Sequence, residues 1–352
     1  MKVAHFITPG GFYGAEQWVL TFLKYFDTDQ GVLVCTDKDD LTLYNKAKGL
    51  GINTHLIKVK GSHSLKEIIT KLSNYMLNEN IDILHTHGYK SDIIGYISAK
   101  SSNKKIVSTP HGWDLQSGIK VKLYDVLDRF VLRFFDKVVP LSQDLFDSLN
   151  HISHKKLVLI NNLVDLDGLP KIQKGNFKTV CYIGRLTELK RVNVIIQAIS
   201  LLPNDIKLQI IGDGPKKTEL IQLTSKLNLD DRIQFLGFRE DRLELLNQSA
   251  ILVLASISEG TSRTLMEAMA LQRVVIGSNI PGNRNLINDT ETGYLFKLND
   301  HKELADIIKN IVDSPLHSDS IAKNGRQYIY ESFSAKTVIE KYIDLYKDTL
   351  SI

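Results

Sequence analysis

The feature that most constrains this chain is a repeated alternation of short β-rich runs with longer segments of helical apolar spacing. The first run, VAHFIT (3–8), ends at glycines, and AEQWVLTFLKYF (15–26) follows with apolar residues at helical intervals. Further strands are predicted at 31–36, 54–59, 82–87, 105–109, 137–142 and 157–161. This alternation predicts a doubly wound α/β fold, in which helices cover both faces of a parallel sheet.

The alternation weakens over residues 161–178, which mix glycines, a proline and charges, and which we interpret as a linker. It then restarts, with strands predicted at 179–184, 207–212, 232–237, 250–256 and 274–278. Helices are predicted from about residue 190 and at 215–227, 240–248 and 262–270. The sequence therefore predicts two Rossmann-like domains, residues 1–165 and 166–333, that face each other across a cleft. Ligands of such sheets bind beyond the carboxyl ends of the strands, so the loops there are the candidate sites.

Composition excludes several classes of protein. A length of 352 residues fits two domains, and 44 basic against 40 acidic residues give no strongly basic chain of the kind that binds nucleic acid. The two cysteines, Cys35 and Cys181, lie in apolar runs and are expected to be buried free thiols. The start of the chain shows no cleavable signal and no long apolar span, so we expect a cytoplasmic protein, with attachment to the membrane surface left open.

The first candidate loop is TPGGFYGAE (8–16), between the first strand and the first helix. Gly10, Gly11 and Gly14 permit positive φ and a close backbone approach, and a helix N-terminus favours a phosphate. The spacing is not that of a dinucleotide-binding loop. Close packing alone is the alternative explanation of these glycines.

Two further loops carry cations or aromatic groups. In GRLTELK (184–190), Arg185 is expected at the end of a strand and Lys190 on the first turn of the next helix, where together they would clamp a diphosphate. The alternative is that both are solvated surface cations. In FLGFRED (235–241), Phe238 or Arg239 could pack on a nucleobase, or simply against the protein.

The fourth loop contains two glutamates, in ILVLASISEGTSRTLMEAMA (251–270). Glu259 follows a buried strand, Thr261 or Ser262 can cap the next helix, and Glu267 lies about one turn inside that helix. A carboxylate accepts two hydrogen bonds and therefore suits the adjacent hydroxyls of a ribose or another sugar. A capping acid and a surface helix acid are the alternative.

Histidines follow two strands of the first domain, in HTHGYK (85–90) and STPHGW (108–113). His85, His87 and His111 lack partners at metal-ligand spacing, so we interpret them as hydrogen-bonding or pH-sensitive contacts rather than as a zinc site. Two D-x-D sequences, at residues 37–39 and 165–167, are interpreted as turns. No metal or other cofactor is expected.

Taken in order, these segments resemble glycosyltransferase family 4. The resemblance is carried by GGFYGAE, HTHGYKSD, TPHG, YIGRLTELKR, IIGDGP, FLGF, SEGTSRTLMEAMA and SNIPGNRNLI, and it covers nearly the whole chain. The family comprises retaining transferases that use nucleotide sugars, including enzymes of bacterial and archaeal surface polysaccharides, and its two-domain fold is called GT-B. The final FSAKTVIEKYIDLY (333–346) resembles the family's last helix, which implies that a helix over about 334–352 packs back onto the first domain.

The resemblance also implies roles for single residues. Arg185 and Lys190 would bind the donor diphosphate, Glu267 the ribose, and Glu259 the donor sugar beside the reacting carbon. The remaining donor contacts would come from Gly10, Gly11, Phe238, Arg239 and the backbone at Arg263, Thr264 and Leu265. His111 would lie near the transferred sugar and join Glu259, Arg185 and Lys190 as the catalytic set. Acceptor-side contacts are expected from Tyr13, His87, Tyr89, Lys90 and Trp113.

The chain departs from the family pattern at two points. Gln272-Arg273-Val274-Val275 stands where the family often has Gly-Arg-Pro-Val, and loss of a glycine at a left-handed helix end costs up to ~1 kcal/mol. Tyr13 stands where a third glycine is frequent, which leaves less room in that loop. The first change removes no expected ligand contact, whereas Tyr13 is a candidate for shaping the choice of acceptor or donor.

These observations predict a metal-independent hexosyltransferase that moves a sugar from a nucleotide diphosphate to an acceptor hydroxyl, with retention through same-face attack. A nucleotide-sugar epimerase of the same fold and a non-catalytic nucleotide-sugar-binding subunit are the alternatives. The acceptor is expected to be a glycan or lipid-linked glycan. Residues 119–137 combine five cations with many apolar positions, which suggests peripheral contact with the inner membrane face, the alternative being an ordinary packed helix.

Overall fold

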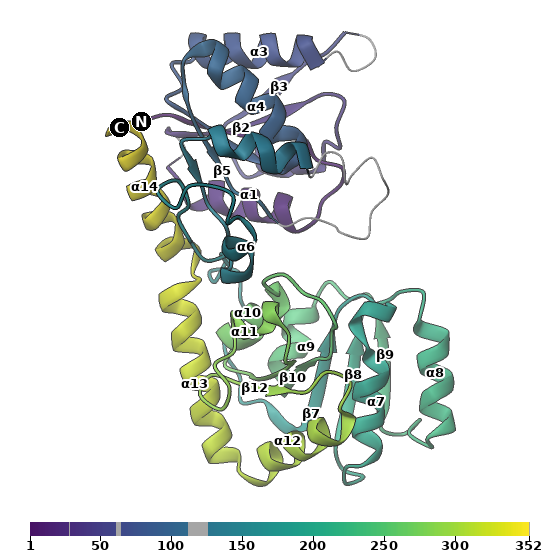
Figure 1. Cartoon of the computed structure of the whole chain (residues 1–352). Helices are drawn as coiled ribbons and strands as arrows, with labels where there is room; N and C mark the ends of the chain where they lie inside the picture. Colours follow the sequence, from purple (N-terminus) through teal and green to yellow (C-terminus); the bar gives the residue numbers. More distant parts are fainter. Residues whose placement is uncertain (28, 61–64, 112–125, 352) are drawn as a thin grey trace. The chain divides into compact units, whose positions relative to one another are not determined.

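The computed structural model describes residues 1–27, 29–60, 65–111 and 126–351. The chain divides into two compact units (Figure 1): the first comprises Met1–Leu163 with Ala335–Ile352, and the second comprises Val164–Ser334. The sequence had placed the domain boundary at residue 165 and the start of the returning helix at about 334. Within the described residues, no helix is long and apolar enough to cross a membrane.

The first unit is built on a parallel sheet. Its strands are β1 (Val3–Ile7), β2 (Gly31–Thr36), β3 (Thr54–Ile57), β4 (Ile83–His87), β5 (Lys105–Ser108) and β6 (Lys137–Val138). Its helices are α1 (Gly14–Tyr25), α2 (Thr42–Gly49), α3 (Leu65–Asn78), α4 (Tyr89–Ser102), α6 (Gln143–Ser148) and α14 (Ala335–Ser351), with the 3₁₀ turn η1 (Leu132–Phe134). In the described part of this unit, the strand order is β3-β2-β1-β4-β5-β6.

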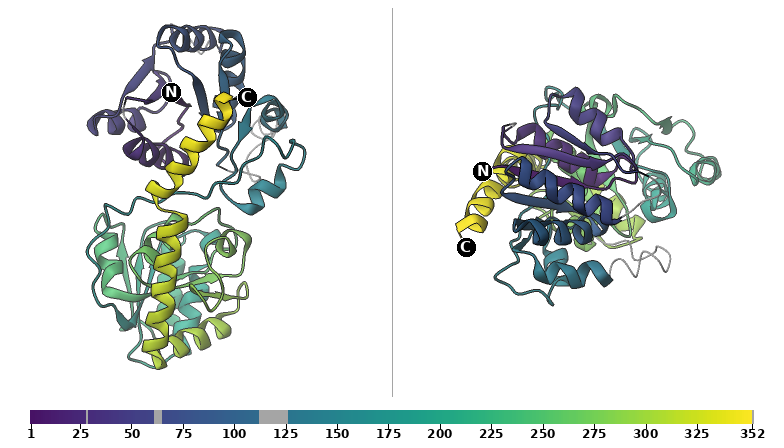
Figure 2. Two further views of the ribbon diagram at one scale, coloured as in Figure 1. Left: turned by 90° about the vertical axis from the view of Figure 1, so that its left-hand side faces the viewer. Right: turned by 90° about the horizontal axis from the view of Figure 1, so that it is seen from above.

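Helices cover both faces of this sheet because side chains alternate along each strand. On β1, Val3 and Ile7 point into a core shared with α1 and α14, whereas Ala4 and Phe6 point into a core shared with α3 and α4. The two layers can be followed in Figure 2, where the C-terminal α14 is yellow. His5 belongs to the same side of β1 as Val3 and Ile7, and its ring lies 4.8 Å from that of Phe22 on α1.

The second unit repeats this architecture. Its strands are β7 (Asn176–Ile183), β8 (Lys207–Ile211), β9 (Ile233–Gly237), β10 (Ser249–Leu254), β11 (Val274–Ser278) and β12 (Tyr294–Phe296). Its helices are α7 (Val192–Ser200), α8 (Lys217–Lys226), α9 (Arg242–Gln248), α10 (Arg263–Ala270), α11 (Pro281–Arg284), α12 (His301–Asp313) and α13 (Pro315–Ser332), with the 3₁₀ turn η2 (Glu188–Lys190). Over the described residues, the sheet order is β12-β11-β10-β7-β8-β9.

Both sheets therefore have the same doubly wound order when each is followed along its own part of the chain. The direction of winding reverses between β1 and β4 in the first unit and between β7 and β10 in the second. Ligands of open α/β sheets bind at such reversal points. The prediction of two Rossmann-like parallel sheets is confirmed.

Several predicted elements differ in detail. Residues 157–161 form no strand, and Leu157 makes only an isolated bridge to Val138. The three-residue β12 was missed because so short a strand has no recognisable periodicity. Lys190, expected on the first turn of a helix, instead ends η2, and α7 begins after Arg191 in the left-handed region at φ 48°.

The second unit begins and ends at one paired point. The amide of Val164 donates to the carbonyl of Phe333 over 2.9 Å, and Val164 bridges to Ser334. Beyond that point, α14 packs on α1 through Val338, Ile339 and Tyr342, in the core of the first unit. Both cysteines are buried free thiols, as predicted.

Candidate active site

The centre of the second unit's site is an ion pair at the reversal point of its sheet. Lys190 follows β7, Glu259 follows the neighbouring β10, and Nζ of Lys190 lies 2.5 Å from Oε1 of Glu259. Both side chains are mostly buried, with 28% of Lys190 and 13% of Glu259 exposed. A backbone hydrogen bond from Ile257 to the carbonyl of Leu189, at 2.9 Å, joins the two loops beside this pair. A backbone hydrogen bond and a side-chain ion pair thus hold the same two loops together.

The Glu259 loop is supported from behind. Ser256 donates from Oγ to Oε1 of Glu259 at 2.6 Å, and Ser278 at the end of β11 donates to the carbonyl of Ser256 at 2.5 Å. On α11, a Cβ at Gly282 would lie 2.2 Å from the carbonyl oxygens of both Glu259 and Gly260. Only glycine permits this approach, so the short α11 acts as a support for the loop.

Arg185 lies at the end of β7, as predicted, and its side chain is exposed. Its backbone is fixed by Tyr182, whose hydroxyl donates to the Arg185 carbonyl at 3.1 Å. The guanidinium makes no ion pair with any described residue, in contrast to Lys190. Burial and the charge of Glu259 raise the pKa of Tyr182, which keeps that hydroxyl protonated.

Glu267 is 2% exposed and held by two arginines. Arg242 on α9 donates to both carboxylate oxygens, at 2.6 and 2.9 Å, and Nε of Arg263 donates to Oε1 at 2.9 Å. The pairing raises the pKa of Arg242. A carboxylate has about four acceptor sites, so three hydrogen bonds leave about one for a further donor.

The helix that carries Glu267 begins as predicted. Ser262 is the N-cap of α10, and its Oγ accepts from the amide of Leu265 at 3.4 Å. The Leu265 side chain is fully buried in the core, so only its backbone can face a ligand. Arg263 is exposed and Thr264 is half-buried.

The segment after β9 reaches the site through a residue that the sequence did not indicate. Phe238 is 77% exposed, and Arg239 is an exposed residue paired with Asp241 at 2.5 Å. Neither contacts Glu267. Arg242, three residues later, does, and since 25 positions separate it from Glu267, no local pattern pointed to the pair.

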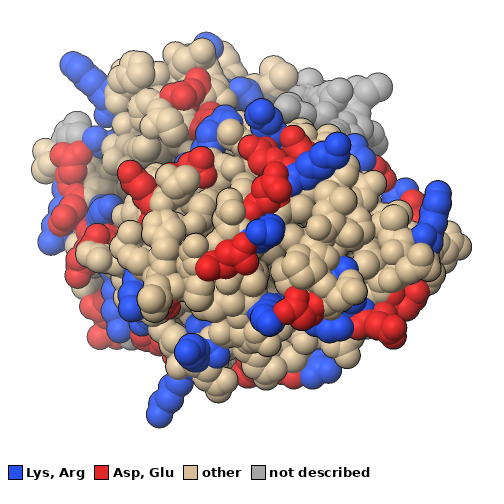
Figure 3. Space-filling view, turned by 90° about the horizontal axis from the view of Figure 1, so that it is seen from below, with Lys and Arg blue, Asp and Glu red and all other residues tan. Residues whose placement is uncertain are grey.

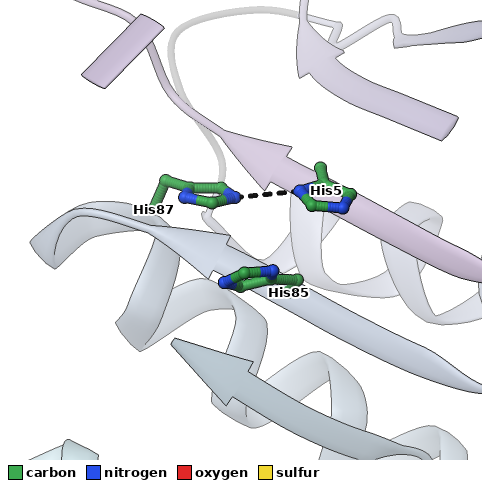
Figure 4. A group of neighbouring side chains, drawn as sticks. All are labelled: His5, His85 and His87. Atoms are coloured by element: carbon green, nitrogen blue, oxygen red, sulfur yellow. Dashed lines mark hydrogen bonds between the residues drawn. The ribbon is translucent and has the colours of Figure 1, made fainter. Parts of the chain in front are cut away.

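In the first unit, the predicted histidines form a cluster with one that was missed. Register pairs His5 on β1 with His85 on β4, and His87 lies two residues further along the same face. His5, His85 and His87 each offer a nitrogen within 4.8 Å of the others (Figure 4). A period of two linked His85 to His87 from sequence, but only the strand register brings in His5.

Hydrogen bonds already engage most of these ring nitrogens. His85 contacts Oγ1 of Thr109 at 2.8 Å and the hydroxyl of Tyr346 at 2.6 Å. His87 contacts His5 at 3.1 Å and His111 at 3.3 Å. Although the spacing of the three rings could accommodate a metal ion, both nitrogens of His85 and of His87 have partners. The histidines thus make the hydrogen bonds that the sequence predicted, while the expectation that they bind no metal stays a prediction.

Burial sets the protonation of this cluster. Desolvation lowers the pKa of His5 to about 3 and the pKa values of His85 and His87 well below the usual range; the other histidines lower the latter two further. Burial also lowers the pKa of His111, which is half-buried. All four rings are neutral near pH 7, which argues against a switch in that range.

The glycine-rich loop differs from the sequence interpretation. Gly10, Gly11 and Gly14 do not have left-handed φ angles; instead a Cβ at Gly11 would lie 2.4 Å from the ring of Tyr13. Tyr13 is 71% exposed, and its amide donates to the buried Glu16 at 2.9 Å, which fixes the start of α1. The glycine thus provides space for a side chain of the same loop.

The other acceptor-side residues lie at the start of α4 or outside the described part. Tyr89 is half-buried and Lys90 is exposed on the first turn of α4, which begins two residues after His87. Trp113 falls among residues 112–125, outside the described residues.

The charged side chains on the face drawn in Figure 3 alternate in sign, so this face carries no continuous basic region.

The chain resembles known glycosyltransferases in sequence. Residues 12–167 match the family model described as Glycosyltransferase Family 4, and residues 170–328 match the model described as Glycosyl transferases group 1. The N-acetyl-alpha-D-glucosaminyl L-malate synthase of Bacillus anthracis is 28% identical over 301 residues, which cover 80% of this chain and 79% of that protein. The UDP-Gal:alpha-D-GlcNAc-diphosphoundecaprenol alpha-1,3-galactosyltransferase of Escherichia coli is 27% identical over 344 residues, which cover 90% of this chain and 88% of that protein.

The fold matches solved structures over the whole chain. Anabaena HepE, solved in complex with UDP, superposes with a TM-score of 0.86 at 19% identity and covers 99% of this chain and 100% of that chain. Identity this low establishes the fold alone, which is GT-B. The two family models together account for most of the sequence, and each covers most of one unit of the structure. The chain therefore belongs to the family 4 glycosyltransferases and is a glycosyltransferase of the GT-B fold.

Proposed function

We propose that this glycosyltransferase moves a hexose from a nucleotide diphosphate sugar to a hydroxyl of a glycan or lipid-linked acceptor during the synthesis of a surface glycan. The Escherichia coli relative is named for a UDP-galactose donor and a diphosphoundecaprenol-linked acceptor. The Anabaena protein was solved with UDP and with UDP-glucose. A UDP-sugar is therefore the donor to test first.

The observation that carries the proposal is the Lys190–Glu259 pair at the strand reversal. A diphosphate is a stronger partner for a lysine than one carboxylate is, because it carries more charge. When the donor binds, Lys190 turns to the diphosphate and Glu259 is released to accept hydrogen bonds from the sugar hydroxyls. In the donor complex, the diphosphate thus replaces Glu259 as the partner of Lys190, and the sugar hydroxyls replace Lys190 as the partner of Glu259.

Positive charge around the diphosphate comes from the protein in this proposal. Arg185 has no ionic partner among the described residues, and the N-terminus of α10 adds backbone N–H groups and a partial positive charge. Charge of this kind stabilises a departing nucleotide diphosphate. We propose that no metal is needed, and we expect full activity in EDTA; loss of activity that Mg²⁺ or Mn²⁺ restores would contradict this.

Glu267 is the proposed ribose contact. Its remaining acceptor site matches one hydroxyl, and Arg242 and Arg263 hold the carboxylate in one orientation. We propose retention of configuration, with attack on the face from which the diphosphate leaves and with the diphosphate taking the acceptor proton. The anomeric coupling constant of the product, measured by NMR, tests retention.

The decisive experiment is a thermal-shift screen against UDP-glucose, UDP-galactose, UDP-N-acetylglucosamine and UDP-N-acetylgalactosamine, followed by transfer assays on lipid-linked and polymer glycan acceptors. Transfer of a sugar from one of them supports the proposal. Formation of an epimerised nucleotide sugar without acceptor would indicate an epimerase instead. Binding of a nucleotide sugar with neither transfer to any acceptor nor hydrolysis would indicate a non-catalytic subunit.

We also propose peripheral contact with the cytoplasmic face of the membrane. Of the basic segment 119–137, residues 119–125 lie outside the described part. In the rest, Val126, Leu127, Phe130 and Phe134 are exposed apolar residues at helical spacing, and the guanidinium of Arg133 lies 5.8 Å from the Phe130 ring. Exposed apolar groups beside cations suit an anionic bilayer surface.

Co-sedimentation with vesicles containing phosphatidylglycerol tests this contact. We expect the wild-type chain to sediment with anionic vesicles and the Phe130→Ser/Phe134→Ser variant to remain in solution. Tyr330→Ser provides a control, because it removes a similarly exposed aromatic residue from the second unit. Equal sedimentation of wild type and the double variant would refute the role of this segment.

A further inference from the structure

Three histidine rings of the first unit form one continuous hydrogen-bonded chain. Nδ1 of His5 contacts Nε2 of His87 at 3.1 Å, and Nδ1 of His87 contacts Nε2 of His111 at 3.3 Å. The first contact is the dashed line in Figure 4. One end of this chain, Nε2 of His5, is buried and without a partner, whereas the other end, His111, is half-buried.

The buried end determines the direction of the chain. A neutral imidazole carries one proton, so each ring donates from one nitrogen and accepts at the other. If His5 carried its proton on Nε2, a buried N–H would have no acceptor; orphaned buried N–H groups are rarer than unused acceptors. The favoured arrangement therefore has the proton on Nδ1 of His5, which donates to His87, which in turn donates from Nδ1 to Nε2 of His111.

We propose that His5 and His87 are positioning residues that hold His111 in the tautomer with its proton on Nδ1, so that His111 presents an N–H donor to a substrate oxygen. The role toward the substrate rests on the proposed function, whereas the tautomer does not. An isolated histidine side chain favours the proton on Nε2. The chain thus imposes the form that His111 would adopt less often alone.

The surroundings fix the geometry that this chain requires. Thr109, two residues before His111, contacts His85 at 2.8 Å and the hydroxyl of Tyr342 at 2.9 Å. The ring of Trp18 lies 5.4 Å from His87 and 5.5 Å from His111. Desolvation keeps the rings neutral near pH 7, which is the condition for a chain with one proton per ring.

The tautomer limits what His111 can do. Its Nε2 accepts from His87, and its Nδ1 carries the proton, so neither nitrogen has a free lone pair to take a proton from an acceptor hydroxyl. His111 in this state is a hydrogen-bond donor and not a general base. This leaves deprotonation of the acceptor to the leaving diphosphate, as proposed above.

Histidine-selective ¹⁵N NMR on the ligand-free chain tests the tautomer directly. The correlations of both ring nitrogens with the carbon-bound ring protons distinguish the two tautomers, and His111→Gln assigns the His111 signals by their loss. We expect a protonated nitrogen at Nδ1 and an unprotonated one at Nε2 of His111 at pH 7.5. A proton on Nε2 of His111 would overturn the proposal.

His5→Phe removes the first donor and keeps an aromatic ring in an aromatic environment; His55→Phe is the matched control, because His55 stacks on Tyr75 in the same unit, outside the chain. We expect His5→Phe to shift His111 toward mixed tautomers, and His55→Phe to leave it unchanged. An unchanged His111 in His5→Phe would show that the chain does not set the tautomer.

The kinetic consequence is measured on the UDP-sugar that turns over in the screen above. We expect kcat of His5→Phe to fall about tenfold while KM for the donor changes less than about threefold, because the misdirected donor affects turnover more than binding. An unchanged kcat with a shifted tautomer would remove the role toward the substrate. Absence of turnover in the wild type would instead refute the proposed function, and the NMR result would stand by itself.

Discussion

The two units share one strand order, yet they differ in how they bury polar side chains: the first buries neutral rings, and the second buries ion pairs and a charged arginine. In the first unit, His5, His85 and His87 are buried as neutral rings that hydrogen-bond to one another and to hydroxyls. In the second, Glu267 is buried as an ion held by two arginines, and Arg273, 3% exposed, donates to backbone carbonyls.

The difference follows from the available partners. A buried charge is tolerated only with opposite charge or several hydrogen bonds around it, which α9 and α10 supply around Glu267. The histidine cluster has hydroxyls, aromatic rings and other histidines as neighbours, so the neutral ring is lower in free energy than the charged one. A neutral cluster fixes the direction of hydrogen bonds, whereas the ionic one fixes the orientation of a carboxylate.

Acid should produce the largest difference in stability between the two units. The folded pKa values of His5, His85 and His87 lie below the unfolded value of 6.5, so below that pH the unfolded chain binds more protons and stability falls. Asp92 opposes this, because burial and the nearby Asp128 raise its pKa and its proton stays on in the folded state. Burial lowers the pKa of the fourth ring, His111, in the same way, so four histidines against one aspartate leave a net effect of about three protons. This predicts a loss of roughly 4 kcal/mol per pH unit below pH 6.

Hydrogen–deuterium exchange at pH 7 and pH 5, corrected for intrinsic rates, measures this loss. We expect peptides of β1 and β4 to lose protection before those of β7 and β10. In His5→Phe, the number of protons taken up on unfolding should fall by about one, so stability should depend less steeply on pH. Equal loss of protection in both units would show that the histidine cluster does not control acid stability.

Glu259→Ala should have the largest effect on catalysis. Removing the carboxylate leaves Lys190 without its partner and the sugar without an acceptor group, and we expect kcat to fall about 100- to 1,000-fold, or roughly 3–4 kcal/mol. Glu188→Ala is the control, since this exposed acid on η2 pairs with Arg191 and Lys216. Steady-state transfer rates decide; wild-type turnover in Glu259→Ala would refute the role of Glu259.

Arg273→Met should destabilise the second unit. The guanidinium donates to the carbonyls of four residues, Gln173, Asn247, Ser249 and Leu271, at 2.7–3.0 Å. Burial lowers its pKa to about 10, so it is charged at pH 7. We expect a loss of about 3 kcal/mol in urea unfolding monitored by circular dichroism. Arg284→Met removes an exposed arginine with one hydrogen bond, at 2.9 Å to Asn279, and should change stability by less than about 0.5 kcal/mol.

Glu267→Ala should affect both stability and donor binding. Arg242 and Arg263 lose their shared partner but remain partly exposed to water, so we expect a stability loss of about 2 kcal/mol. Affinity for UDP, measured by isothermal titration calorimetry, should fall about tenfold, while kcat changes less. A fall in kcat as large as that of Glu259→Ala would contradict separate roles for the two glutamates.

Substitution of Gln272 should give the smallest effect, and here glycine should be more stable than alanine. Gln272 has φ 58° directly after α10, which glycine adopts without strain, but its side chain also donates to Asp319 at 3.0 Å. Gln272→Ala loses the same hydrogen bond and keeps the strain. We expect the glycine variant to be about 1 kcal/mol more stable than the alanine variant in thermal unfolding. Equal stabilities would remove the strain argument.

Local patterns sufficed for much of the fold. Short apolar, β-rich runs and helical spacing predicted most strands and the doubly wound class, because each buried strand of a parallel sheet is apolar over its whole length. The left-handed position at Gln272 also followed from the sequence, which narrowed the cap of α10 to Thr261 or Ser262, since both features depend on a few adjacent residues. The strand predicted at 157–161 does not form, because Leu157 pairs with Val138 through a single bridge only. Local pattern does not determine such pairing.

The sequence by itself placed the candidate site residues in the loops and helices that follow the strands, and it named Arg185, Lys190, Glu259, Glu267 and His87 by type and position. Only the tertiary structure decided which of them meet. Strand adjacency brings Lys190 to Glu259 across 69 positions, a helix end brings Arg242 to Glu267, and strand register adds His5 to the histidine cluster. Such partners are set by packing between distant segments, and a sequence read segment by segment contains no measure of that distance.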